Sequence, residues 1–409
     1  MKKTLLFAVL AGVMAICISS CKKEPQDGPK ETYTIEFRQD MNVALVGTAV
    51  KFTDLSLGAT SRTWKFQDGT PATSTDAEVS VVFGSFGQKN CSLEVTFPDK
   101  STQKKEFTIQ VNEELSAAIA VSGPFGAIKE QCSGLYAMTM AEHGYITLAF
   151  DPSFTGESSG KPRRTASPDI NTEDFLAAVD YLSQRSDVDA EKIGIIGICG
   201  WGGIALNAAA QDPRIKATAA MTMYDMSRVN GNGYFDADDN EEARLAARQA
   251  LAAERTKAAQ SGNTTPGGGV VDPLPEDAPQ FVKDYYDYYK TPRGYHPRSG
   301  NSNDGWHPFG CQAYANTRFL YYINEIRNAV LIVHGEKAHS RYFGEAAYRY
   351  MLDGKAEGYD AVRKPNPVPE NKELLIIPGA SHCDLYDGGK DKVIPWGKLA
   401  SFFNENMKK

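Results

Sequence analysis

The sequence predicts an α/β domain with a mostly parallel, doubly wound sheet, preceded by a small all-β module. Three observations support this fold class. Short apolar runs alternate with helical stretches over the C-terminal two-thirds, an earlier stretch alternates Val, Phe and Thr with polar residues, and 409 residues exceed what one core usually organises. We therefore expect two folded domains behind a short N-terminal segment.

The N-terminal segment has the pattern of a secretory signal over residues 1–20. A positively charged start leads into an apolar stretch from Leu5 to Ile18, and a small-residue site ends at Cys21. This site resembles the lipobox of bacterial lipoproteins. The resemblance implies an acylated Cys21, a polar tether over 21–31, and an exported protein held to the membrane of the cell envelope by its lipid. An ordinary signal peptide is the alternative.

The net charge and the cysteine content limit which partners and which redox chemistry are expected. Removal of the signal would take the formal net charge from −7 to about −9, which argues against nucleic acid as a partner. Export would place the remaining cysteines where disulfides persist, but an odd number leaves at least one thiol free. These cysteines are Cys91, Cys132, Cys199, Cys311 and Cys383.

The all-β module is expected over 32–112, where residues 50–53 and 92–97 alternate in polarity between Gly and Asp turns. The stretches VKFTDLS, TWKFQDGTPATS and GQKNCSLEVTF resemble a PKD domain, an immunoglobulin-like sandwich. The usual Phe-Gly-Asp-Gly of that family here reads Phe66-Gln67-Asp68-Gly69. We expect Trp64 to pack between the sheets. The resemblance implies a spacer or an interaction module and no chemistry.

The α/β domain is expected over 113–409. Its predicted strands are nearly all apolar, as strands buried on both faces are. A helix is expected over Glu173–Arg185, and ligands of such sheets bind at the carboxyl ends of the strands. The expected strands are Ala117–Val121, Ile146–Phe150, Ile193–Ile198, Ala217–Met221, Val330–Val333 and Leu374–Ile377.

Three motifs at strand ends point to a family. They are GYITLAFDPSFTGES at 144–158, IGIIGICGWGG at 193–203, and IIPGASH, which ends at His382. They resemble the dienelactone-hydrolase-like branch of the α/β-hydrolases over almost all of this domain. The resemblance implies hydrolysis of an ester or lactone through a Cys/His mechanism. No cofactor is expected, and no metal is expected because His334 and His339 lack the one-turn spacing of a zinc-binding pair. It also implies that the sheet is shortened at one edge or covered there by the module, because the usual antiparallel pair before Ala117–Val121 is missing.

The nucleophile depends on the register of the turn after the central strand. If Gly197-Ile198-Cys199-Gly200-Trp201 is the turn, Cys199 is the nucleophile, with a pKa lowered by the helix N-terminus and a histidine, and His382 is the general base. If Cys199-Gly200-Trp201-Gly202-Gly203 is the turn, Trp201 holds that position and the activity is lost. We favour Cys199 slightly.

The third triad member has no unique candidate. The family usually has His-Gly-x-x-Asp after the penultimate strand, but Ala338 stands at the Asp position here. Asp225 and Glu336 are the candidate carboxylates that would orient His382. The backbone N–H groups of Gly200 and of the loop at Phe125 would form the oxyanion hole.

An insertion of about 227–322 interrupts the strand-helix rhythm, with a helix expected over Glu241–Gln260, a Gly-Pro-rich loop and then many aromatics. In this family such an insertion is a lid.

The sequence leaves two hypotheses for the function of the whole protein. The first is a lipid-anchored ester or lactone hydrolase, and the second is a non-catalytic surface lipoprotein that binds a carbohydrate or protein partner.

Overall fold

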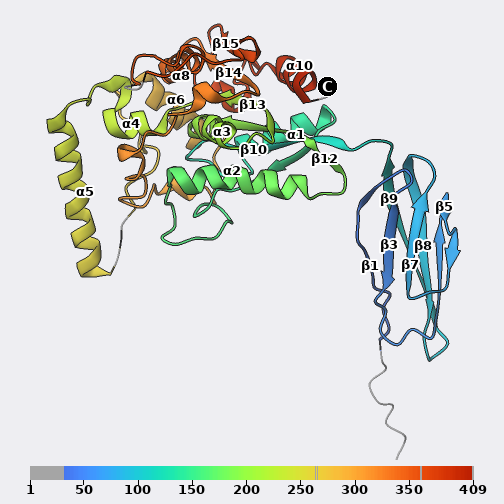
Figure 1. The fold of residues 1–409 in the computed structure, drawn as a ribbon. Helices are drawn as coiled ribbons and strands as arrows, with labels where there is room; N and C mark the ends of the chain where they lie inside the picture. Colours follow the sequence, from blue (N-terminus) through green and yellow to red (C-terminus); the bar gives the residue numbers. More distant parts are fainter. Residues whose placement is uncertain (1–31, 263, 265, 360–361, 408–409) are drawn as a thin grey trace, which may run out of the picture. The chain divides into compact units, whose positions relative to one another are not determined.

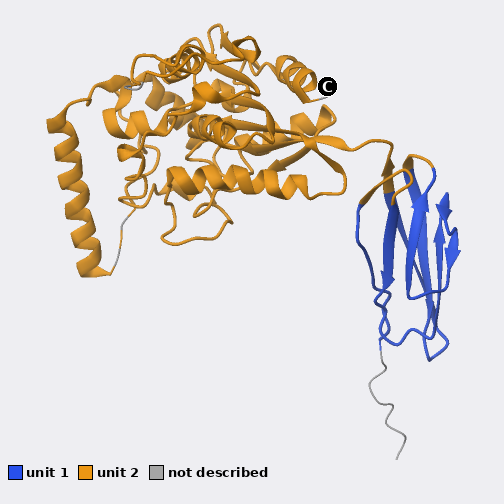
Figure 2. Cartoon of the chain, viewed as in Figure 1, with its two compact units in different colours: residues 1–42, 49–84, 88–109 blue, residues 43–48, 85–87, 110–409 orange. Residues whose placement is uncertain are grey.

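The computed structural model describes residues 32–262, 264, 266–359 and 362–407 (Figure 1). The predicted signal, tether and Cys21 lie outside these residues. The chain divides into two compact units, shown in Figure 2. Unit 1 comprises Met1–Asn42, Ala49–Gly84 and Gln88–Ile109, and unit 2 comprises Val43–Thr48, Ser85–Gly87 and Gln110–Lys409.

The N-terminal module consists of two sheets with the strand orders β1-β3-β7-β5 and β2-β9-β8-β4-β6. Trp64 is fully buried, and its ring lies 5.9 Å from that of Phe52 in the other sheet. The aromatic core between the sheets therefore gives the all-β module that the alternating sequence predicts. The strands are β1 Phe37–Gln39, β2 Val43–Leu45, β3 Ala49–Asp54, β4 Ser61–Phe66, β5 Gly69–Thr70, β6 Thr73–Ser74, β7 Glu78–Phe83, β8 Gly87–Thr96 and β9 Thr102–Asn112.

The large domain contains a six-stranded sheet in which every neighbouring pair is parallel, in the order β11-β10-β12-β13-β14-β15. Each strand lies where an apolar run predicts it, and the parallel α/β fold is confirmed. Strand β11 forms one edge, so the sheet has no antiparallel pair before β10 in the described residues. The strands are β10 Ser116–Ser122, β11 Ile146–Ala149, β12 Val188–Ile198, β13 Ile215–Met221, β14 Ala329–Gly335 and β15 Lys372–Ile377.

Helices cover the sheet on both sides (Figure 1). Helices α2 and α3 pack together through Phe175 and Trp201, whereas α1 and α10 meet through Tyr136 and Trp396. The expected helix at Glu173–Arg185 begins earlier, at Pro168, where proline suits the first turn. These helices are α1 Cys132–Glu142, α2 Pro168–Ser183, α3 Gly200–Gln211, α8 Arg341–Asp353, α9 Asp384–Asp387 and α10 Trp396–Met407.

The insertion between β13 and β14 combines helices with long loops. Its longest helix, α5 Glu241–Ser261, has no buried residue and stands away from the sheet at the left of Figure 1. Asn240 caps its start by accepting a hydrogen bond from the Ala243 N–H at 2.7 Å. The other elements here are α4 Met226–Asn232, η1 Tyr234–Asp236, α6 Gln280–Tyr289, α7 Gly300–Asn303, η2 Tyr314–Asn316 and η3 Ile323–Glu325.

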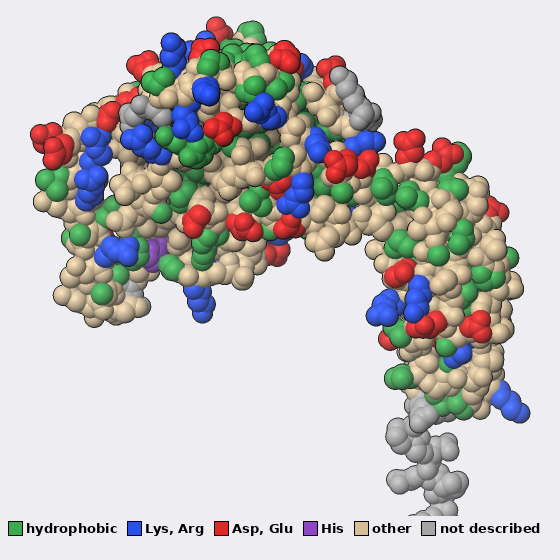
Figure 3. All heavy atoms as spheres, in the orientation of Figure 1, with side chains coloured by type: hydrophobic (Ala, Val, Ile, Leu, Met, Phe, Trp, Pro, Cys, Tyr) green, Lys and Arg blue, Asp and Glu red, His purple; other side chains and the backbone are tan. Residues whose placement is uncertain are grey.

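The five cysteines of the described region are all free thiols. Four are buried, and Cys311 is partly exposed. None of the helices in that region has the length and apolarity to cross a bilayer. On the face shown in Figure 3, acidic and basic side chains are interspersed.

Candidate active site

The turn from β12 into α3 places Cys199 at its crest. Cys199 has φ +60° and ψ −126°, a backbone conformation that side-chain-bearing residues rarely adopt. A Cβ atom at Gly197 would lie 2.0 Å from the carbonyl oxygen of Trp201, so the chain makes this sharp turn only with glycine there. The turn has the strained strand-to-helix geometry of a nucleophile elbow.

Trp201 lies below this crest and does not occupy it. Its indole is buried, with ring centroids 5.8 Å from Phe150 and 5.3 Å from Phe175. The register that puts Trp201 at the nucleophile position is therefore wrong. A bulky residue is accepted here because its side chain points into the packing between α2, α3 and the sheet.

The Cys199 thiol lies among hydrogen-bonding groups. The backbone N–H groups of Gly200 and Phe125 and the hydroxyls of Tyr386 and Tyr285 interact with it. A Cβ at Gly200 would lie 2.5 Å from the Phe125 ring, so glycine lets this loop approach the thiol. Burial nevertheless raises the pKa of the Cys199 thiol. The expected lowering of this pKa is wrong, because desolvation outweighs the nearby donors.

His382, just after β15, is completely buried and reaches the thiol only through Tyr386. Its Nε2 lies 2.9 Å from the Tyr386 hydroxyl, and Tyr386 also contacts the Cys199 thiol. Burial lowers the pKa of His382 well below its ordinary value, so the imidazole is neutral near pH 7 and able to accept a proton. Tyr386 thus stands between the thiol and the imidazole.

The second ring nitrogen of His382, Nδ1, lies beside hydroxyl groups and not beside a carboxylate. Nδ1 lies 2.8 Å from the Thr222 hydroxyl and 2.7 Å from the Ser340 hydroxyl. A hydrogen on Nδ1 would donate to these oxygens and leave Nε2 to accept from Tyr386. Thr222 and Ser340 therefore orient the imidazole in the place where a triad would have its acid.

Neither candidate carboxylate reaches His382. Asp225 caps α4, where its Oδ1 accepts hydrogen bonds from the Ser227 and Arg228 N–H groups at 3.0 Å. Glu336 is exposed and accepts from the Gly379 N–H at 2.8 Å. The structure therefore does not bring Asp225 into the Cys199 and His382 constellation, because its short helix takes up the side chain.

Sequence reasoning missed Thr222, Ser340 and Tyr386. Tyr386 follows His382 by four residues, a spacing that one helical turn brings together, and this was the only available signal. Thr222 follows β13 with φ +42°. Ser340 follows the position at which the family pattern expects Asp. No motif distinguishes either hydroxyl from an ordinary loop residue.

An ion-pair network holds the Tyr386 segment in place. Arg293, which follows α6, donates to both carboxylate oxygens of Asp387 at 2.8 and 2.7 Å and to the Cys383 carbonyl at 3.1 Å. A bidentate pair of this kind fixes geometry as well as charge. The insertion is thereby joined to the short helix α9 that carries Tyr386.

Cys199 lines a cavity of about 460 Å³. Most of the cavity wall comes from the insertion, including Tyr285, Tyr289 and Trp306, and Phe125 and Tyr386 complete the aromatic surface around the thiol. Within the described parts of the chain, no three His, Cys, Asp or Glu side chains gather where they could hold a metal ion. The arrangement suits an apolar ligand whose polar group meets the thiol.

The chain belongs to the α/β hydrolase fold family, whose family model matches residues 127–389. Protein PA2218 of Pseudomonas aeruginosa is 51% identical over 291 residues, covering 71% of this chain and 73% of the relative. Its crystal structure has a TM-score of 0.65 at 43% identity and covers 86% of this chain and 95% of that one. YcjY of Escherichia coli is 31% identical, with coverage of 77% and 94%.

More distant similarities concern the fold or a part of the chain. The α/β hydrolase GrgF from Penicillium sp. sh18 has a TM-score of 0.54 at 18% identity over 78% of this chain and 99% of its own. The thiohydrolase aneE of Aspergillus aculeatus is 32% identical over 123 residues, which is 30% of this chain and 39% of that protein.

Proposed function

We propose that the protein is a thiol-dependent hydrolase of esters or lactones, with Cys199 as its nucleophile. The observation that carries the proposal is the position of Cys199 at the strained crest of the turn, facing an aromatic cavity and flanked by the N–H groups of Gly200 and Phe125. The dienelactone-hydrolase-like motifs support the same chemistry.

In the proposed reaction, the Cys199 sulfur attacks the substrate carbonyl carbon while the thiol proton passes to Tyr386, whose own proton passes to Nε2 of His382. The carbonyl oxygen becomes an oxyanion that the Gly200 and Phe125 N–H groups stabilise. Collapse of this intermediate breaks the C–O bond, and the leaving alkoxide takes the proton from His382. Water then attacks the thioester carbonyl while its proton passes through Tyr386 to His382. The C–S bond breaks and the acid is released. The proton returns from His382 through Tyr386 to the Cys199 sulfur, which restores the thiol.

The lining of the cavity favours a substrate with an apolar or aromatic body. Aromatic side chains make up much of the wall, and the reacting carbonyl would lie at its polar end. We propose that the insertion acts as the lid, because its residues from Val229 to Cys311 form that wall. The relative named a thiohydrolase makes a thioester a useful second substrate to assay.

Hydrolysis of p-nitrophenyl acetate tests the nucleophile. We expect Cys199→Ala to lower kcat/KM at least 10³-fold, because it removes the attacking atom. Cys91→Ala is the matched control, since Cys91 lies in β8 of the N-terminal module and does not line the cavity, and it should retain activity within threefold. Equal activity in wild type and Cys199→Ala would remove Cys199 from the mechanism. No activity in wild type on esters, lactones and thioesters would favour the non-catalytic binding protein.

The signal pattern supports export and lipid anchoring at Cys21, and the PKD-like module supports a spacer between the anchor and the hydrolase domain. Radiolabelled palmitate should be incorporated into the full-length protein in a bacterial host and should be absent from Cys21→Ala. Equal labelling of both proteins would contradict the anchor without bearing on the hydrolase proposal.

A further inference from the structure

A second cavity, of about 530 Å³, shares helix α4 with the candidate active site. Met226, Val229 and Asn230 of this helix line the Cys199 cavity, whereas Arg228, Gly231 and Asn232 line the second one. The helix therefore presents different faces to the two cavities. We call the second one the arginine cavity, because four arginines line it: Arg228, Arg244, Arg248 and Arg318.

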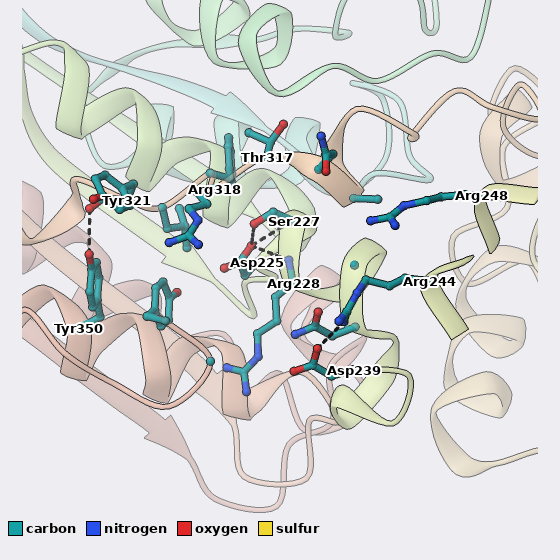
Figure 4. A pocket seen from close by; sticks show the side chains of 18 residues that line it. Asp225, Ser227, Arg228, Asp239, Arg244, Arg248, Thr317, Arg318, Tyr321 and Tyr350 are labelled. Atoms are coloured by element: carbon teal, nitrogen blue, oxygen red, sulfur yellow. Dashed lines mark hydrogen bonds and ion pairs between the residues drawn. The ribbon is translucent and has the colours of Figure 1, made fainter. Parts of the chain in front are cut away.

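These four arginines come from three segments: the neighbouring helices α4 and α5, and the loop at Arg318, which follows much later in the sequence. Figure 4 shows Arg244 and Arg248 entering from α5 on one side and Arg318 lying on the other side, with Arg228 of α4 between them. Arg244 and Arg248 are four residues apart, so one face of α5 carries both guanidinium groups. Basic side chains are also visible along α5 at the left of Figure 3.

The cavity has more positive than negative charge at its surface. Arg228 is neutralised by Asp236 and Arg244 by Asp239. Asp225, the other acid of the lining, has its Oδ1 engaged by backbone N–H groups of α4. Arg248 makes no hydrogen bond or ion pair with any residue that the structure describes, and Arg318 adds a further guanidinium. The acids present are thus engaged already, and the charge of Arg248 has no counterpart.

The position of helix α5 beside the arginine cavity is not explained by a hydrophobic core. This polar helix buries no residue, so apolar packing does not explain its position. Arg255 joins it to the body by donating to Gln312 at 3.0 Å and by lying over the Phe309 ring at 4.4 Å. The helix is therefore held where its arginines form one wall of the cavity.

We infer that the arginine cavity binds a small molecule carrying an oxyanion, a carboxylate or a phosphate group, between Arg248 and Arg318. Guanidinium groups match both oxyanions through paired N–H donors. The volume is in the range of small-molecule sites, and the lining is polar, unlike that of the Cys199 cavity. This inference does not depend on the proposed hydrolase activity.

Isothermal titration of the purified protein with inorganic phosphate and, separately, with succinate tests the site, with sodium chloride at equal ionic strength as the reference. We expect saturable 1:1 binding of at least one of the two, and the tighter one identifies the oxyanion. Arg248→Gln and Arg318→Gln should each raise Kd about tenfold, because each removes a charged hydrogen-bond partner. Lys257→Gln removes a charge from α5 outside the cavity and should leave Kd within twofold.

Absence of saturable binding by both anions, an unchanged Kd in either arginine variant, or equal weakening in Lys257→Gln would overturn the inference. Arg248 is exposed, so its replacement should leave the thermal unfolding curve unchanged. Cys199→Ala should bind the anion as tightly as wild type. A failed esterase assay with intact anion binding would therefore count only against the proposed function, and the reverse result only against this site.

Discussion

At the residue scale, the proposed chemistry depends on two neutral groups and the phenol between them. Burial raises the pKa of Cys199 and lowers that of His382, so a thiol faces a neutral imidazole near pH 7. Such a pair needs proton transfer during attack and does not rely on a preformed thiolate. Burial also raises the pKa of Tyr386 far above its ordinary value, which keeps its hydroxyl able both to donate and to accept.

Removal of the Tyr386 hydroxyl should therefore interrupt proton transfer. We expect Tyr386→Phe to lower kcat about 10²-fold with little change in KM, because general-base help is lost while the cavity keeps its shape. Stopped-flow and steady-state hydrolysis of p-nitrophenyl acetate measure both constants.

Tyr288→Phe is the matched control for this variant. The Tyr288 ring packs 4.9 Å from that of Tyr386, and Tyr288 is not among the residues in contact with the thiol or with His382. Its kcat should stay within twofold of wild type. A fully active Tyr386→Phe would show that the proton takes another route.

At the element scale, the elbow brings the backbone at the end of β12 into close contact with the backbone at the start of α3. Gly197 faces the Trp201 carbonyl, and the Trp201 indole anchors the start of α3 against α2. The same contact that exposes Cys199 to the cavity also packs the helix onto the sheet. Stability and activity are therefore coupled at the elbow.

Gly197→Ala should destabilise the large domain. The added methyl would stand 2.0 Å from a carbonyl oxygen that belongs to the backbone and cannot rotate away. Overpacking of this kind costs about 2–3 kcal/mol or more, so the thermal midpoint should fall by roughly 5 °C or more. Calorimetry of the purified protein measures the thermal midpoint.

Gly397→Ala in α10 is the corresponding control. A methyl there meets no atom within 4 Å, and alanine suits a helix better than glycine. The midpoint should stay the same or rise slightly. Equal effects of the two substitutions would mean that the elbow has room to relax.

At the scale of the whole molecule, three histidines lie close together in the large domain: His334 and His382 are fully buried, and His339 is partly buried. Burial lowers the pKa of His334 to about 3 and that of His339 to about 4, and lowers that of His382 as well. His339 and His382 have ring centroids 4.9 Å apart. Protonating any of them would place a charge in the core.

Acid should therefore destabilise this domain. Below about pH 6.5 the unfolded chain binds these protons and the folded chain does not, so the free energy of unfolding falls as the pH falls. Each histidine contributes up to about 2 kcal/mol of loss at pH 5 by this linkage. Urea unfolding between pH 7.5 and 5 measures the trend.

His334→Asn should make this loss about one-third smaller, since one of three buried imidazoles is gone. His143→Gln, at an exposed position, should leave it unchanged. A urea midpoint that does not vary between pH 7.5 and 5 would contradict the expectation.

Sequence by itself determined the architecture of the large domain. Six apolar runs correspond to the six parallel strands, because strands buried on both faces have few polar residues. Its motifs at the strand ends, through their resemblance to the dienelactone-hydrolase-like family, also identified Cys199 and His382 as candidates. The all-β module was predicted from period-two alternation, and the expected packing of Trp64 between the sheets is confirmed by its burial.

Only the tertiary structure decided which turn register exists, that Asp225 caps a helix away from His382, and that Thr222, Ser340 and Tyr386 surround the imidazole. These contacts join segments up to 160 residues apart. Local patterns record the periodicity of one element, whereas hydrogen bonds between loops depend on how several elements pack. The arginine cavity is of the same kind, because its guanidinium groups meet only when α4, α5 and the loop at Arg318 come together.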